Sequence, residues 1–94
     1  MEADELFESL EAVVDETSFA HFVSLLIDDR RIADSMALTP EGFQGEWANQ
    51  SIASFLEASH AWAKDSSYGD RPGPKLNNPW RVFAGFLWAG RGYE

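Results

Sequence analysis

With 94 residues the chain has the length of one domain, and its four Trp, seven Phe and two Tyr can supply the core that so small a domain needs. Its net charge of −9 arises before residue 30, where nine carboxylates occur without a single Lys or Arg. This concentration of negative charge argues against nucleic acid and anionic membranes as partners. The lack of cysteine removes disulfides, thiolate ligands and a cysteine nucleophile, as is typical of a reducing compartment.

No segment of the chain has the properties of a signal or a membrane span. The N-terminus lacks both a basic segment and an apolar stretch, so it does not resemble a secretory signal. The longest apolar run, Val82 to Gly90, is far shorter than the ~20 residues that a bilayer requires. We therefore expect a cytoplasmic protein.

The first predicted helix covers residues 3–14. Apolar residues recur there at the spacing of one helix face: Leu6, Phe7, Leu10, Val13 and Val14. The opposite face carries a stripe of acids: Asp4, Glu8, Glu11 and Asp15. Because negative charge at the C-terminal end of a helix opposes the helix dipole, we expect Asp15 and Glu16 to end this helix.

A second helix is predicted over residues 18–30, with Thr17 or Ser18 as its N-cap. The helical period is kept by Phe19, Phe22, Val23, Leu26 and Ile27. If the helix continued at the same pitch, Asp29 and Arg30 would lie on its apolar side. Either the helix ends near Asp28, or these two charges have partners in the interior. We expect the first outcome, with a break or loosening between residues 29 and 34.

The next segment, residues 34–50, has no sustained period. Thr39-Pro40-Glu41 predicts a single capped turn, and Gly42 and Gly45 indicate a loop. A third helix is predicted over residues 50–65, beginning at Asn49 or Ser51. One of its faces carries Ile52, Phe55, Leu56, Ser59, Trp62 and Ala63.

Residues 66–78 indicate an ordered loop, after which Asn78-Pro79 predicts a cap followed by the first helical residue. The last helix, over residues 79–91, is apolar on nearly every side, which is typical of a helix that is buried on every side. Gly85, Gly90 and Gly92 would weaken it unless another backbone packs closely against them. We therefore predict an all-α fold, a compact four-helix domain whose C-terminal helix is buried among the other three.

Patterns for catalysis or metal binding are weak. Glu57 and His60 have the Glu-x-x-His spacing of carboxylate-bridged di-iron bundles, but such a site needs a second copy and two further glutamates. His21 and His60 are the only histidines, and neither lies in a recognisable catalytic motif. The turn from Gly69 to Lys75 has no nearby helix start to bind an anion. We predict neither an enzyme nor a metal or cofactor site.

The acidic stripe and some of the aromatic residues are the candidates for partner binding. No Lys or Arg is interspersed to form i, i+4 pairs with the acids, so their repulsion is uncompensated. A solvated face that confers solubility is the simpler interpretation, and attraction of a cationic partner is the functional one. Thirteen aromatics exceed what a small interior needs, so those on predicted loops are expected at the surface. The candidate residues are Asp4, Glu8, Glu11, Asp15, Phe43, Trp47 and Tyr68.

Several short motifs resemble a known family. They are Phe19-x-x-Phe22, Trp47-x-Asn49, Ile52-x-x-Phe55-Leu56-Glu57-Ala58 with Trp62, Asn78-Pro79-Trp80-x-x-Phe83-Ala84-x-x-Leu87, and Gly90-x-x-Tyr93-Glu94. Together they are similar to a family of small bacterial proteins described only as a domain of unknown function. The resemblance covers almost the whole chain and implies one compact domain. It implies no activity.

Two classes of function are compatible with these features. The first is an acidic protein-interaction domain, most concretely a stoichiometric inhibitor such as a toxin immunity protein or a phage anti-defence protein. Its expected partner is a basic protein, for example a nuclease toxin or a host defence factor, and neither nucleic acid nor a membrane. The alternative is a small-molecule-binding or regulatory module whose Trp-rich loops form the pocket. An acidic structural domain without a ligand is a third interpretation.

Overall fold

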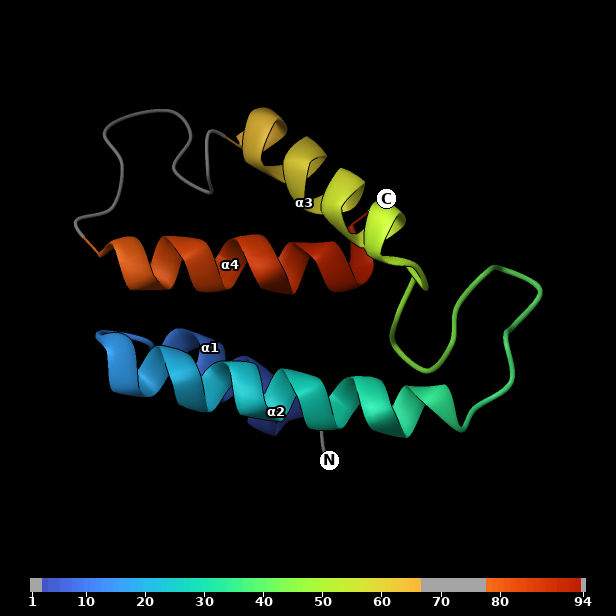
Figure 1. The fold of residues 1–94 in the computed structure, drawn as a ribbon, viewed down its shortest axis with the longest axis horizontal. Coiled ribbons are helices and arrows are strands. Elements are labelled where there is room, and N and C mark those ends of the chain that lie inside the picture. The colour runs from blue at the N-terminus through green and yellow to red at the C-terminus, as the bar shows by residue number, and fades with distance from the viewer. Residues whose placement is uncertain (1–2, 67–77, 94) are drawn as a thin grey trace.

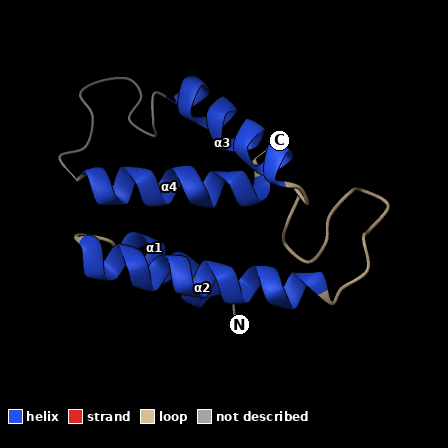
Figure 2. Cartoon of the chain, viewed as in Figure 1, coloured by secondary structure: helices blue, strands red, loops and turns tan. Residues whose placement is uncertain are grey.

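The computed structural model describes residues 3–66 and 78–93, which fold into four helices (Figure 1). They are α1 (Ala3–Glu11), α2 (Glu16–Asp34), α3 (Ile52–Ser66) and α4 (Pro79–Gly92). The expected all-α fold is confirmed, since Figure 2 shows helices and loops without a strand in this part of the chain. Two isolated backbone bridges, Leu38 to Gln44 and Gln44 to Trp47, order the loop between α2 and α3.

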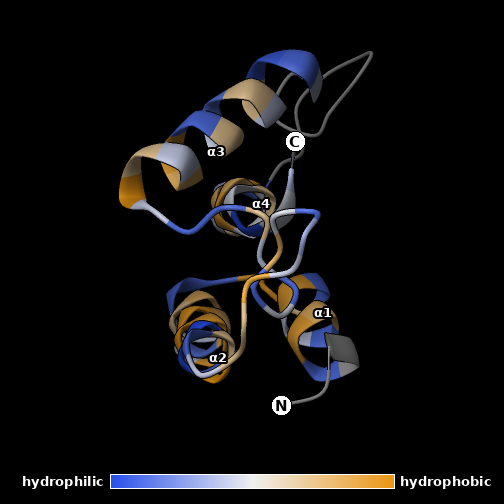
Figure 3. Ribbon diagram, turned by 90° about the vertical axis from the view of Figure 1, so that its right-hand side faces the viewer, coloured by the Kyte–Doolittle hydropathy of each residue, from blue (hydrophilic) through white to orange (hydrophobic). Residues whose placement is uncertain are grey.

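The helices are arranged around α4. In Figure 1, α4 lies between α3 on one side and the pair of α1 and α2 on the other, and it packs against all three. Within the described residues, the backbones of α2 and α3 do not approach each other. The end view in Figure 3 shows that α2 and α3 both lie on one side of the molecule, whereas α1 lies beside α2 on the other side.

Apolar residues of α1, α2 and α4 form most of the core. Its buried members are Leu6, Leu10, Val13, Phe22, Leu26, Ala33, Trp47 and Ala84. Leu6 and Phe22 are fully enclosed, and the rings of Phe7 and Trp88 pack against each other with centroids 5.7 Å apart. The first and the last helix are therefore joined through one apolar interior.

The central position of α4 is confirmed, but its expected burial on every side is wrong. Ala84 and Ala89 are buried, whereas Phe83 is 53% exposed and Trp80 is 39% exposed. The reason is the separation of α2 from α3, which leaves one side of α4 without a covering helix.

α1 is shorter than predicted because Asp15 caps α2. The Asp15 carboxylate accepts a hydrogen bond from the backbone N–H of Ser18 at 2.9 Å, and the Ser18 hydroxyl oxygen accepts one from the backbone N–H of Asp15 at 3.1 Å. This capping box starts α2 at Glu16, so the expectation of Thr17 or Ser18 as the N-cap is wrong. Residues 12–14 are left to form the connection.

α2 continues to Asp34, so the expected break between residues 29 and 34 is wrong. Asp29 is buried and forms an ion pair with Arg91 of α4. Arg30 forms one with Asp34 on the next turn of the same helix. Asp29 therefore has its partner in the interior, as the second alternative required, whereas Arg30 has its partner at the surface.

The start of α3 agrees with the second of the two predicted caps. The Ser51 hydroxyl oxygen accepts a hydrogen bond from the backbone N–H of Ser54 at 3.1 Å, as an N-cap does. Asn49 instead donates its side-chain amide to the carbonyl oxygen of Gly90 at 3.0 Å. Asn78 is the N-cap of α4, as predicted.

Two of the three glycines in α4 lie at a close helix contact. A Cβ atom at Gly90 would lie 2.5 Å from Oγ of Ser59, and one at Gly85 would lie 3.2 Å from the ring of Trp62. At Gly92 the nearest atom would be 4.0 Å away. Close packing of α3 therefore explains Gly85 and Gly90, but not Gly92.

Candidate functional site

In the described part of the chain, three open pockets lie along α2, two of them against Trp47 and Phe55 and one against the start of α4. We refer to them together as the α2–α3 groove. The largest, of about 470 Å³, is lined by Arg30, Trp47 and Leu56 among others. A second, of about 390 Å³, shares Arg30 and Trp47 with the first and extends along α2 to Val23. The third, of about 400 Å³, lies one helical turn before Val23, between Phe19 and the start of α4. The groove therefore follows most of α2.

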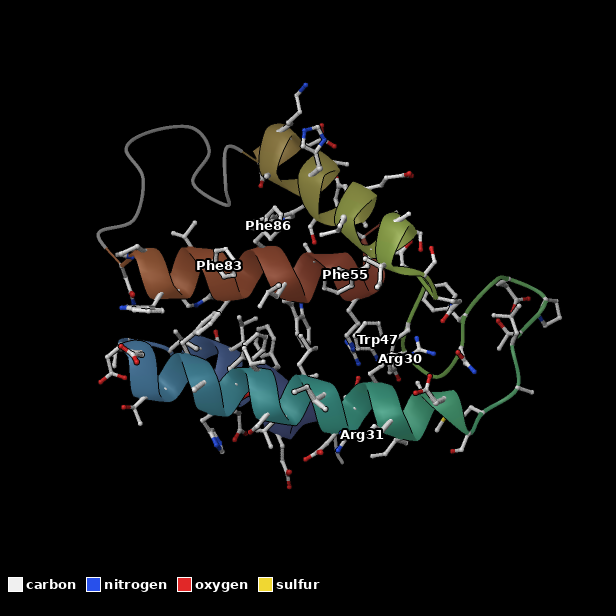
Figure 4. The ribbon with its side chains drawn as sticks, in the orientation of Figure 1. Arg30, Arg31, Trp47, Phe55, Phe83 and Phe86 are labelled. Carbon is white, nitrogen blue, oxygen red and sulfur yellow. The ribbon has the colours of Figure 1, made fainter. Side chains whose placement is uncertain are left out.

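Aromatic rings contribute to this groove at both of its ends. In Figure 4, Phe83 lies on α4 near its start, Phe86 lies between α4 and α3, and Phe55 and Trp47 lie near the other end of α4. The rings of Trp47 and Phe55 are stacked with centroids 6.1 Å apart. Phe83 lies 5.8 Å from Phe86 and 5.6 Å from Phe19, again between ring centroids. Trp47 and Phe55 therefore line two of the pockets, Phe19 and Phe83 line the third, and Phe86 supports Phe83 from behind without lining a pocket.

The walls of the groove are aliphatic and largely exposed. Ile27 of α2 is 45% exposed, and Leu56 and Ile52 of α3 are 52% and 81% exposed. The predicted apolar face of α3 is thus divided, since Ser59 is buried and donates a hydrogen bond to the carbonyl oxygen of Phe86 at 2.8 Å. Large aliphatic side chains that remain in water are typical of a surface that another molecule covers.

A buried ion pair holds Trp47 in the floor of the groove. Oδ2 of Asp29 accepts hydrogen bonds from Nε1 of Trp47 at 2.9 Å and from Nε of Arg91 at 3.0 Å. The guanidinium of Arg91 also lies 4.8 Å from the centre of the Trp88 ring. Its Nη2 atom is buried and has no hydrogen-bond partner in the described residues. The cluster connects α2, the following loop and α4.

Sequence reasoning did not identify this cluster, although Asp29 offered the signal. A carboxylate in the apolar arc of a helix requires either a helix end or a buried partner. Nothing in the local sequence pointed to Arg91, which follows 62 residues later.

The wide end of the groove carries positive charge. Arg30 lies over the Trp47 ring, with Cζ 5.1 Å from the ring centre, and donates hydrogen bonds to Asp34 at 2.7 Å and to Gln50 at 2.9 Å. Arg31 lines the same part of the groove and is exposed. Its side chain has no ion pair or hydrogen bond among the described residues. Among the residues that line this pocket, Arg30 and Arg31 exceed Asp34 by one positive charge, and the exposed Asp28 lies one turn before Arg31 outside the lining.

The acidic face lies on α1 and at the start of α2. We define it by its exposed acids, which are Glu5, Glu8, Glu11, Asp15 and Glu16. In the part of the chain that the structure describes, none of them forms a salt bridge. Asp4 lies in α1, but its side chain is outside the described part. Figure 3 places α1 beside α2 on one side of the molecule, whereas α3 lies above α2 on the other side, so the acids of α1 and the α2–α3 groove are on separate surfaces.

Asp15 combines a structural role with its exposed charge. The backbone N–H of Ser18, and then the Ser18 hydroxyl, donate hydrogen bonds to the Asp15 carboxylate and lower the pKa of Asp15 below its usual value. Its negative charge is therefore present throughout the neutral range.

The structure places two of the three loop aromatics that were expected at the surface. Phe43 is half-buried in the loop between α2 and α3. Trp47 is only 5% exposed, so its expected surface position is wrong: Phe55 and Arg30 cover its ring. Tyr68 lies outside the described residues. Of the two that are described, Trp47 contributes to the groove as a supporting side chain, and Phe43 lines none of its three pockets.

Glu57 and His60, the residues with metal-ligand spacing, are both exposed on α3. The described residues contain no group of three or more His, Cys, Asp or Glu side chains placed to bind one metal ion. No helix within residues 3–66 or 78–93 is long and apolar enough to cross a membrane.

Comparison with known proteins identifies a family. No curated protein and no solved structure matches the chain. A family model matches residues 15–94, a span that starts at the N-cap of α2 and includes the α2–α3 groove and the buried ion pair. α1 precedes this span. The expected relation to an uncharacterised family is confirmed: the chain belongs to DUF7660, a family of unknown function.

Proposed function

We propose that this chain is a protein-interaction domain that binds a basic protein surface through its acidic face and inhibits that partner in a stoichiometric complex. The observation that carries the proposal is the exposure of five acids on α1 and at the start of α2, with no Lys or Arg before residue 30. Their mutual repulsion is unfavourable in the unbound chain, and a cationic surface relieves it.

The spacing of these acids suits a partner that binds nucleic acid. Exposed carboxylates three or four residues apart on a helix, such as Glu5, Glu8 and Glu11, lie about 5–6 Å apart. A row of negative charges at this spacing mimics a strand of backbone phosphates. A nuclease toxin or a host defence factor with a basic cleft is therefore the partner class we propose, and a toxin immunity protein or a phage anti-defence protein is the corresponding role.

A small-molecule-binding module is the alternative, and the groove supports it less well. Pockets for small ligands enclose most of the ligand surface. Here the walls are themselves in water, since Ile52 is 81% exposed and Leu56 is 52% exposed. An open apolar groove of this kind fits a protein surface better than a small ligand.

Charge reversal on α1 tests the proposed function. The full chain and its Glu8→Lys/Glu11→Lys variant serve as baits in a lysate of the native host, and the association rate of the captured protein is measured at low and high salt. Because attraction between opposite charges accelerates encounter, the variant should lower the association rate by about tenfold or more. Added salt should slow the wild type towards the variant.

The matched control is Glu41→Lys/Glu57→Lys, which changes the net charge equally at two exposed acids outside the acidic face. It should change the association rate much less. Binding that is insensitive to salt and equally affected by both double variants would show that the acidic face is only a solvated surface.

A further inference from the structure

One side of α2 carries apolar residues between an acidic start and a basic end. Glu16 lies in the first turn, and Ala20, Val23 and Ile27 follow at steps of four, three and four residues, which keep them on one side of the helix. Arg31 follows four residues later at the wide end of the groove. Val23 is half-buried, and the other four side chains are exposed.

This pattern is complementary to its own reversed copy. Val23 lies seven residues after Glu16 and eight before Arg31. When two α2 helices cross antiparallel at Val23, Glu16 of each copy lies opposite Arg31 of the other, and the apolar residues between them meet. A parallel pair would instead bring like charges together, which opposes association.

We propose that a second copy of this chain docks along the α2–α3 groove, with its α2 antiparallel to α2 of the first copy. Such an interface is isologous, because the same surface of each copy contacts the other, and it closes into a dimer. It covers apolar side chains that a single chain leaves in water, namely Ile27, Ile52, Leu56 and Phe83, which are between 45% and 81% exposed.

The charges around the groove favour a second copy over other occupants. Arg31 repels a uniformly basic segment, and Glu16 repels a uniformly acidic one. An antiparallel α2 of a second copy instead places an acid opposite Arg31 and a base opposite Glu16. Of the acidic face, only Glu16 belongs to this interface. The acids of α1 lie beside α2, away from the groove, and stay uncovered in this arrangement (Figure 3). The dimer therefore does not depend on the basic partner proposed above.

Sedimentation velocity of the full chain over a range of concentrations tests the proposal. We expect a species of twice the 10.5 kDa chain mass, which dissociates on dilution. Ile27→Glu places a charge in the interface and should leave only monomer. Ile32→Glu is the matched control, because Ile32 is also exposed on α2, at 38%, but does not line the groove, and it should leave the dimer unchanged. Circular dichroism verifies that each variant is folded.

Two results of this experiment overturn the proposal. One is a wild-type chain that remains monomeric at every concentration, which leaves the groove to a helix of another protein or to a small ligand. The other is a dimer that Ile27→Glu does not weaken, which places the interface elsewhere.

A charge exchange tests the antiparallel arrangement. Glu16→Arg and Arg31→Glu each bring like charges together and should weaken the dimer by about tenfold or more. The double variant restores both opposite-charge pairs and should recover most of the wild-type association. If both single variants weaken the dimer and the double variant does not recover it, the antiparallel pairing is excluded.

Discussion

The carboxylate of Asp15 caps α2 and also belongs to the acidic face. Its charge was expected to end the first helix, and in the structure it begins the second. An acid at an N-cap is stabilised by the unpaired N–H groups of the first turn and by the positive end of the helix dipole. The same residue is therefore unfavourable for one helix and favourable for the next.

Removal of this cap should destabilise the fold in a pH-dependent way. Asp15→Ala should lower the melting temperature at neutral pH, whereas Asp15→Asn keeps an acceptor for the Ser18 N–H and should lower it less. Because the folded-state pKa of Asp15 is lowered, its contribution is complete above the unfolded-state pKa and is lost as the pH falls through the folded-state pKa. The difference between wild type and Asp15→Ala should therefore shrink in acid.

Thermal unfolding followed by circular dichroism at neutral and acidic pH measures this effect. Equal melting temperatures for the Ala and Asn variants at neutral pH would contradict the role of Asp15 as a cap.

At the scale of helices, the contact between α3 and α4 depends on Gly90. A Cβ atom at this position would lie 2.5 Å from Oγ of Ser59 and 2.8 Å from the ring of Phe55. Phe55 in turn stacks on Trp47, so this contact also positions the floor of the α2–α3 groove. A missing side chain on α4 thereby lets α3 approach its backbone.

Gly90→Ala should therefore lower the free energy of unfolding by about 1–3 kcal/mol, because the neighbouring side chains must move to admit the methyl group. The higher helix propensity of Ala acts in the opposite direction and offsets part of this loss. Gly92→Ala is the matched control in the same helix, with the nearest atom 4.0 Å from the added Cβ, and its effect should stay within about 0.5 kcal/mol. Urea unfolding measures both. A Gly90→Ala chain as stable as Gly92→Ala would show that α3 can shift at little cost.

At the scale of the whole molecule, the Asp29 cluster connects segments that are far apart in the sequence. Arg91 contributes a second connection, because its carbonyl oxygen accepts a hydrogen bond from the backbone N–H of Ala48 at 2.9 Å. The loop after α2 is thus attached to the end of α4 through side chain and backbone. Since the backbones of α2 and α3 do not approach each other within the described residues, these connections and α4 hold the two walls of the groove in place.

Asp29→Ala should cost about 3–5 kcal/mol of unfolding free energy, because it leaves Arg91 buried without its counter-charge. The control is Asp34→Ala, which removes the partner of Arg30 in a more exposed ion pair and should cost about 1 kcal/mol or less. Replacing both buried partners, in Asp29→Leu/Arg91→Met, should restore much of the stability. Urea unfolding of the three variants measures the difference. A loss for Asp29→Ala no larger than for Asp34→Ala would contradict the importance of the buried pair.

The sequence by itself determined the helical class, the approximate extent of α3 and α4, the cap at Asn78 and the concentration of acids before residue 30. These features follow from residues within about four positions of one another, since helix period, capping and dipole effects all act over that range. The helical period also showed that Asp29 falls among the apolar residues of α2. It did not show which residue pairs with the Asp29 carboxylate.

Only the tertiary structure decided that α2 continues past Asp29 and does not end near Asp28. It likewise decided that Trp47 is buried and that Phe83 is exposed. Each of these depends on residues that meet across long stretches of sequence: Trp47 lies 18 residues from Asp29, and Arg91 lies 62. A helix that is apolar all round does not specify which of its sides will be covered. That is set by where the other helices pack, and here α2 and α3 leave a groove between them.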